Sequence, residues 1–201
     1  MMIGAVVENI IGGYLHPRAS VRRLLNAGHG LDVALMMVVL AFLVREIFFI
    51  VTPDARPETM GLSLGRYVLN LVDALLSFAV FSLAICYVGR LFGGKGSLRQ
   101  TGLVLAWYLL VTSAVVPLVL PAVLRIVKAA EAAAAAPAAL PAALPAGAAL
   151  IVLVSSGVLL WLLASYVAEL HRFARTWSVL AAIIGLSIPF SMIASALLPL
   201  A

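Results

Sequence analysis

The residues whose types and spacing come nearest to known chemistry form one glycine-rich stretch. It reads Gly89-Arg90-Leu91-Phe92-Gly93-Gly94-Lys95-Gly96, with a glycine, four residues and then glycine and lysine, as in the first part of a phosphate-binding loop. Such a loop also needs a preceding strand and, directly after the lysine, a Ser or Thr whose hydroxyl holds magnesium. Here Gly96 takes the hydroxyl position, Ser97 comes one residue late, and a long apolar segment precedes. The stretch therefore predicts a tight turn that uses glycines at positive φ, and no nucleotide site.

Three charged residues, Arg45, Glu46 and Asp73, fall inside long apolar runs. At the helical rise, Arg45 and Asp73 lie about 10 Å and about 9 Å inside the same ends of two neighbouring runs. Because an isolated ion in a bilayer costs ~2.5–3.5 kcal/mol, we expect these two to pair. Glu46 points about 100° away from Arg45, so it serves Arg45 indirectly or faces another helix. The shallow depth favours a structural pair that fixes how two helices dock, and an ion or proton path is the alternative.

No other constellation resembles a catalytic, cofactor or metal site. Neither a Ser-His-Asp nor a Cys-His arrangement can be assembled, and no carboxylate pair stands out for acid–base work. Cys86 is the single cysteine and lies in an apolar run. The histidines are isolated, without metal-ligand spacing to Cys, Asp or Glu, and read as surface or headgroup residues: His16, His29 and His171. Glu169 has Arg172 three residues on, which predicts a local pair. We therefore expect no enzyme, no cofactor and no bound metal.

The composition places most of the chain in lipid. Of the 201 residues 65% are hydrophobic and 10% charged, with a mean hydropathy of +1.19, whereas soluble domains carry about 25% charged residues. The net charge of +5 comes from thirteen Lys and Arg residues. They stand singly or in short groups between apolar runs, as the positive-inside rule predicts, and this spacing argues against a nucleic-acid partner.

Five apolar runs reach the ~20 residues that a helix needs to cross ~30 Å of hydrocarbon. They cover about 31–52, 67–89, 102–124, 148–167 and 177–199. Since backbone groups in lipid must be satisfied within each segment, we predict an all-α integral membrane bundle of five transmembrane helices over 31–201. Kinks are expected at the prolines inside these runs: Pro117, Pro121 and Pro189.

The segments outside these runs indicate how the chain is oriented in the membrane, and one of them is predicted to be a spacer. Eight basic residues lie in the N-terminal, second and fourth connecting segments and four in the others, which predicts a cytoplasmic N-terminus and an external C-terminus. Within 1–30, apolar residues at helical spacing up to Tyr14 predict a short interfacial helix. The Ala/Pro-rich loop 128–147 predicts a helical extension from Arg125 to about Ala136 and then a semi-rigid connector.

The central loop also resembles a known family. The run from Leu91 to Gln100, between two spans, is similar to the central loop of the YIP (Ypt-interacting protein) domain, with motif residues Gly93, Gly94, Lys95, Gly96, Ser97 and Arg99. His16-Pro17-Arg18, Trp161 and the segment 166–182 fit as well. The resemblance implies a five-span membrane protein with a cytoplasmic N-terminus. Eukaryotic members associate with Rab-type GTPases and with each other, and their GTPase-contacting region is usually assigned to a long cytoplasmic N-terminal segment. This chain has about thirty residues before its first span and resembles the bacterial branch.

These observations lead to one expected function and one alternative. We expect a non-enzymatic multi-pass protein of a bacterial inner membrane that works through helix–helix contacts, as an oligomer or as an accessory subunit of a membrane complex. Its expected partners are the lipid bilayer and other membrane proteins or itself, with no nucleic acid and no nucleotide. The alternative is a small transporter or channel, which the intramembrane charges and the expected kinks favour. The odd number of spans and the lack of a visible inverted repeat argue against it.

Overall fold

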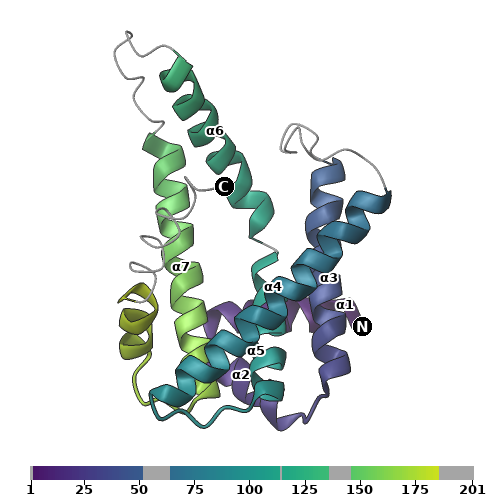
Figure 1. The fold of residues 1–201 in the computed structure, drawn as a ribbon, viewed down its shortest axis with the longest axis vertical. Coiled ribbons are helices and arrows are strands. Elements are labelled where there is room, and N and C mark those ends of the chain that lie inside the picture. The colour runs from purple at the N-terminus through teal and green to yellow at the C-terminus, as the bar shows by residue number, and fades with distance from the viewer. Residues whose placement is uncertain (1, 52–63, 114, 136–145, 186–201) are drawn as a thin grey trace, which may run out of the picture.

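The described part of the chain is all-α, as predicted. A computed structural model describes residues 2–51, 64–113, 115–135 and 146–185 (Figure 1). Its helices are α1 (Met2–Leu15), α2 (Pro17–Asn26), α3 (Leu31–Val51), α4 (Leu64–Leu91), α5 (Leu98–Ser113), α6 (Val116–Ala135), α7 (Ala146–Leu170) and a shorter helix, Thr176–Gly185.

Three of these helices are long and apolar enough to cross a membrane: Leu31–Ile50 within α3, the whole of α4, and α7. They match the first, second and fourth predicted spans. The fifth predicted span begins in the helix Thr176–Gly185. Its remainder, with the kink predicted at Pro189, lies outside the described residues. The chain is therefore an all-α protein of the kind that passes a membrane several times.

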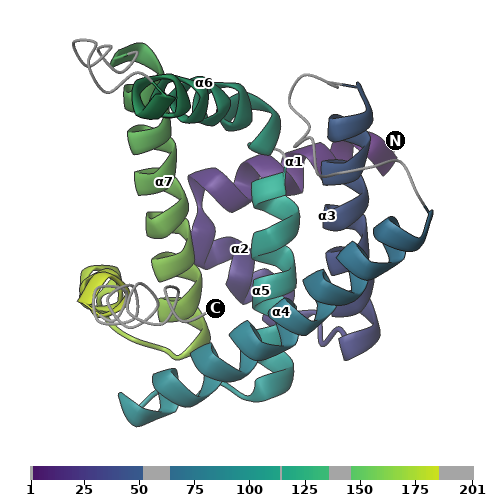
Figure 2. The ribbon, with the colours of Figure 1, turned by 45° about the horizontal axis from the view of Figure 1, so that its top comes forward.

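The third predicted span, 102–124, is wrong as a single kinked helix. The structure divides it between α5 and α6, and α6 leaves the direction of α5 to pack on α7 (Figures 1 and 2). The hydroxyls of Thr112 and Ser113 donate to the carbonyls of Tyr108 and Leu110 at 2.8 and 2.7 Å, and such bonds compete with helix continuation. Pro117 then falls in the first turn of α6, where no backbone donor is needed.

The helix after this break confirms the predicted extension. α6 continues from Val116 through the alanine run to Ala135, one residue short of the predicted end. Pro121 lies inside it. The connector predicted to follow lies outside the described residues.

The core forms around α5, which is the central helix. Six consecutive residues, from Thr101 to Ala106, are buried, and together they cover every face of this helix. α3 and α4 pack on one part of α5 and α2 and α7 on another (Figure 2). A helix that is apolar all round is buried in this way, so its sequence is explained by protein neighbours on several sides rather than by lipid.

The N-terminal segment is helical, as the spacing predicted, and is bound to the bundle. The hydroxyl of Tyr14 donates to the carbonyl of Val111 at 2.7 Å, and that of Tyr166 donates to the carbonyl of Gly13 at 3.2 Å. Val21 of α2 is fully buried in a second apolar cluster with residues of α5 and α7. α2 therefore contributes to the core and the end of α1 is anchored to it, and a position in the headgroup region stays a prediction.

Candidate functional site at the glycine loop

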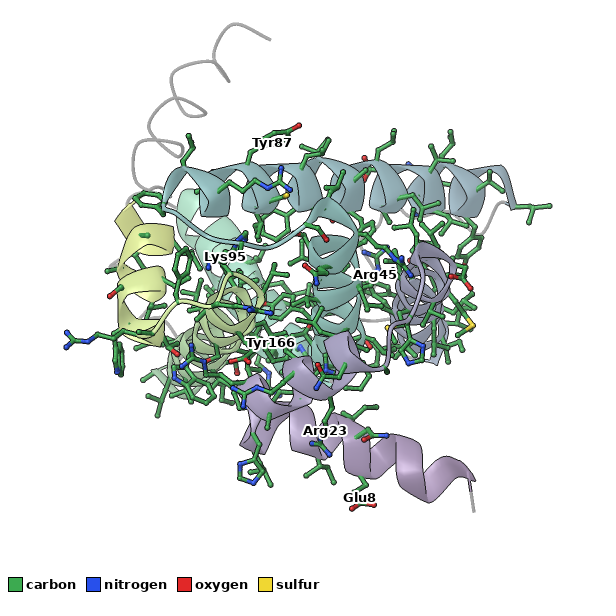
Figure 3. The ribbon with its side chains drawn as sticks, turned by 90° about the horizontal axis from the view of Figure 1, so that it is seen from below. Glu8, Arg23, Arg45, Tyr87, Lys95 and Tyr166 are labelled. Carbon is green, nitrogen blue, oxygen red and sulfur yellow. The ribbon has the colours of Figure 1, made fainter. Side chains whose placement is uncertain are left out.

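Three segments that are far apart in the sequence meet at one end of the bundle. They are the end of α2 with 27–30, the loop 92–97 after α4, and the turn 171–175 after α7, all at the bottom of Figure 1. Arg99 donates to the carbonyls of Gly28 at 3.4 Å and His29 at 3.2 Å, which joins the first two segments. Seen from below in Figure 3, Lys95 lies over this end of the bundle. The three segments therefore lie together at one end of the bundle, and their position on one side of a membrane stays a prediction.

The glycine loop begins with a helix C-cap. Gly93 has φ +82°, its N–H donates to the carbonyl of Arg90 at 2.9 Å, and the N–H of Gly94 donates to the carbonyl of Gly89 at 2.8 Å. This pair of bonds is a Schellman motif, in which glycine is favoured because the left-handed conformation strains other residues. The predicted tight turn with a glycine at positive φ is confirmed.

The loop ends with a helix N-cap. The backbone N–H of Ser97 donates to the side-chain Oε1 of Gln100 at 3.0 Å, and the N–H of Gln100 donates to the Ser97 hydroxyl at 3.3 Å. These reciprocal bonds form a capping box that starts α5. The glycines thus end α4, and Ser97 and Gln100 start α5, with only six residues between the two helices.

Between the two caps the loop encloses His171. This side chain is 1% exposed, so the interpretation of His171 as a surface histidine is wrong. A Cβ atom added at Gly89 would lie 2.1 Å from the imidazole Nε2, and one at Gly94 would lie 2.4 Å from Nδ1. A Cβ at Gly96 would lie 3.0 Å away. Three glycines, one in the last turn of α4 and two in the loop that follows it, therefore make the space that the imidazole fills.

Hydrogen bonds fix the imidazole in this space. The N–H of Gly96 donates to Nδ1 of His171 at 3.3 Å, and the N–H of Lys95 donates to the His171 carbonyl at 3.4 Å. Since Nδ1 accepts the hydrogen bond from Gly96, the neutral ring carries its proton on Nε2. Burial lowers the pKa of His171, and the nearby charge of Arg90 lowers it further, whereas the backbone of Ile85 raises it. His171 is held as a neutral structural group.

The same bonds leave the loop without the backbone donors of a phosphate-binding loop. Each N–H from Gly93 to Ser97 donates to a protein acceptor, namely Arg90, Gly89, His171 (from two residues) and Gln100. A phosphate-binding loop instead points several such groups at the phosphate oxygens. The geometry therefore supports the expectation that this loop holds no nucleotide.

Glu169, near the end of α7, links that helix to α2. Its carboxylate accepts from Nε of Arg22 at 2.8 Å and lies 3.4 Å from Nε of Arg18. Arg18 also donates to the backbone carbonyls of Phe173 and Ala174. The hydrogen bond to Glu169 and its charge raise the pKa of Arg22. Among the described residues, Glu169 forms its ion pairs with α2 and not with Arg172, the predicted partner.

The conformation of Arg172 explains that difference. Its φ is +58°, so the chain has left the helix and the three-residue helical spacing no longer applies. The N–H of Arg172 donates to the Glu169 carbonyl and that of Phe173 to the Ala168 carbonyl at 2.8 Å, which is a second Schellman motif. An arginine occupies the position that usually holds glycine, at a conformational cost of about 1 kcal/mol.

The other predicted group lies away from this end, within α3 and α4. Arg45 donates to the carboxylate of Glu46 at 3.2 Å, and its guanidinium lies 5.1 Å from the ring centroid of Phe42. Glu46 is buried, while Asp73 is exposed and forms no ion pair with any described residue. The pairing therefore differs from the predicted one. α4 packs chiefly on α5 and crosses α3 obliquely (Figure 1), which leaves Asp73 on an outer face.

A comparison with known protein families finds a match over most of the chain. The Yip1 domain matches residues 11–197, which is nearly the whole chain. No curated protein and no solved structure matches it significantly. The matched range includes α2, the glycine loop and the turn at His171, and by this match the chain belongs to the Yip1 domain family.

Proposed function

We propose that this protein works through helix–helix contacts in the membrane, as an oligomer or as an accessory subunit of a larger membrane complex. Yip1 domain proteins are generally non-enzymatic membrane trafficking proteins. An assembly role is in keeping with that class, and it requires a surface that another membrane helix covers better than lipid does.

The observation that carries the proposal is the position of Asp73. It lies nine residues into the 28-residue α4, one of the three candidate spans. The side chain is exposed and has no hydrogen bond or ion pair with any described residue. A charged group at such a position costs several kcal/mol in lipid unless a partner satisfies it, and intramembrane carboxylates accordingly mark functional contacts.

The surroundings of Asp73 form an apolar outer face on α4. Leu69, Leu76 and Val80 follow at helical spacing and are 67%, 62% and 66% exposed. Figure 3 shows side chains of α4 projecting away from the bundle, with Tyr87 on that outer side. A partner helix with a basic or hydrogen-bonding side chain at the depth of Asp73 would satisfy the carboxylate and cover this face.

The test is the size of the full-length protein extracted from native membranes in mild detergent. Asp73→Leu is expected to lose the oligomer or the co-purifying subunit, because the polar contact is removed. Ser77→Leu is the matched control, since Ser77 lies one turn further along α4 and is exposed. It should retain the complex.

Two other outcomes decide against the proposal. Loss of the complex in both variants would show that the complex does not depend specifically on the carboxylate, because Ser77→Leu leaves Asp73 in place. A wild type that purifies as a single copy, and whose thermal stability depends on a dissolved ion through Asp73, would favour the transporter alternative.

We also infer that the glycine-loop side faces the cytoplasm of a bacterium and that the chain lies in the inner membrane. The excess of basic residues in the segments of that side supports this orientation. Truncation fusions after Ser97 and after Ala135 should report opposite sides, with fluorescent protein active after Ser97 and alkaline phosphatase active after Ala135. The reverse pattern would invert the orientation.

A further inference from the structure

The end of the bundle that holds the glycine loop also contains a cavity of about 730 Å³ that is open to the surface. Its walls come from α2, from the glycine loop with the start of α5, and from the turn after α7. The cavity thus depends on the three segments that the contacts of His171, Arg99 and Arg18 hold together.

Basic side chains outnumber acidic ones in the lining. Arg18, Arg22, Lys95 and Arg172 face the cavity, against the single carboxylate of Glu169. That carboxylate is shared by Arg18 and Arg22, and Arg18 is further engaged with backbone carbonyls. The side chains of Lys95 and Arg172 have no ion pair or hydrogen bond with a described residue. The lining therefore holds uncompensated positive charge.

The backbone at Arg172 indicates that its side chain is used. Arg172 stands in the left-handed conformation that the second Schellman motif requires, where glycine would be unstrained. Backbone positions of this kind persist only where the surrounding structure fixes them, and they cluster at functional sites. A guanidinium at the cavity wall contributes charge and paired donors for an anion.

The cavity also lies at the level where headgroups are expected. It adjoins Leu170, the last residue of the candidate span α7, and Phe173 and Leu25 add apolar wall. Basic pockets at the ends of membrane helices bind the phosphates of anionic lipids. We propose that this cavity binds a phosphate-bearing anion, and that Lys95 and Arg172 are the side chains that hold its phosphate.

The test measures the thermal unfolding midpoint of the full chain in mild detergent while one ligand is added. The ligands are short-chain phosphatidylglycerol, zwitterionic short-chain phosphatidylcholine, and inorganic phosphate. Phosphatidylglycerol is expected to raise the midpoint in a dose-dependent and salt-sensitive manner, and phosphatidylcholine is not. An equal response to inorganic phosphate would identify a soluble phosphate compound, rather than a lipid, as the source of the anion.

Variants locate the site. Lys95→Gln and Arg172→Gly should each weaken the apparent affinity about tenfold, the effect of losing one charge-assisted contact. Arg172→Gly also relieves the left-handed strain, so its midpoint without ligand should stay level or rise, and its loss of binding cannot come from unfolding. Arg23→Gln is the matched control, because Arg23 adjoins Arg22 in α2 but does not line the cavity and lies apart from Lys95 (Figure 3).

Two results would overturn the proposal. One is the absence of any shift with both anions. The other is an Arg23→Gln variant that weakens binding as much as the lining variants, since this would indicate diffuse surface charge. Neither result bears on Asp73, because that residue is on α4 and outside the cavity lining, so the assembly proposal is tested separately.

Discussion

Gly89→Ala is expected to lower the free energy of unfolding by about 3 kcal/mol, at the upper end of the usual cost of overpacking. In an ordinary helix this change stabilises, because alanine is a better helix former than glycine by up to about 1 kcal/mol. Here the new Cβ would lie 2.1, 2.3 and 2.6 Å from three atoms of the His171 ring. The ring is buried and held by the glycine loop, so it has no free direction in which to move.

The measurement is thermal or denaturant unfolding in detergent, with Gly157→Ala as the matched control. Gly157 also lies within a candidate span, and a Cβ added there meets no atom within 4 Å. That variant should be neutral or slightly stabilised. The double variant Gly89→Ala with His171→Ala should cost clearly less than the sum of the two single changes, because the clash disappears with the ring. Additive costs would show that Gly89 does not make room for His171.

His171→Ala is expected to lower the free energy of unfolding by about 2–4 kcal/mol. The change empties a fully enclosed site, and large-to-small substitutions in cores cost amounts of this size. It also leaves the buried N–H of Gly96 without its acceptor, which adds a desolvation penalty. His29→Ala is the control, since His29 is exposed and donates nothing to the loop through its side chain in the described structure.

His171 is also expected to make the free energy of unfolding decrease at acidic pH. Because burial lowers the pKa of folded His171 below the ordinary value of 6.5, the folded state disfavours the charged ring. The stabilising contribution is therefore complete above pH 6.5 and is lost as the pH falls from there through the folded pKa. Wild-type unfolding midpoints should fall over this window more steeply than those of His171→Ala. Parallel pH profiles for the two proteins would contradict a buried neutral histidine.

The sequence alone was sufficient for the class and for the local turns. Apolar runs of about 20 residues identify candidate membrane helices, since lipid leaves a spanning segment few other ways to satisfy its backbone. α3, α4 and α7 were predicted in this way. The turn at Gly93 was predictable because positive φ favours glycine. Ser97 and Gln100 carry the sequence signal of a capping box, which could have been found from their three-residue spacing.

Tertiary structure decided the features that depend on which segments meet. Burial of His171 requires two turns 75 residues apart to close on one ring, and no local pattern around an isolated histidine encodes that contact. Glu169 pairs with α2 because α7 ends beside it, and Arg45 pairs with Glu46 because α4 turns Asp73 outward. The hydropathy pattern also predicted one span where the structure has α5 and α6, because hydropathy reports how apolar a segment is and not where a helix changes direction. Spacing within one helix is fixed by backbone geometry, whereas contacts between helices depend on the packing of the whole bundle.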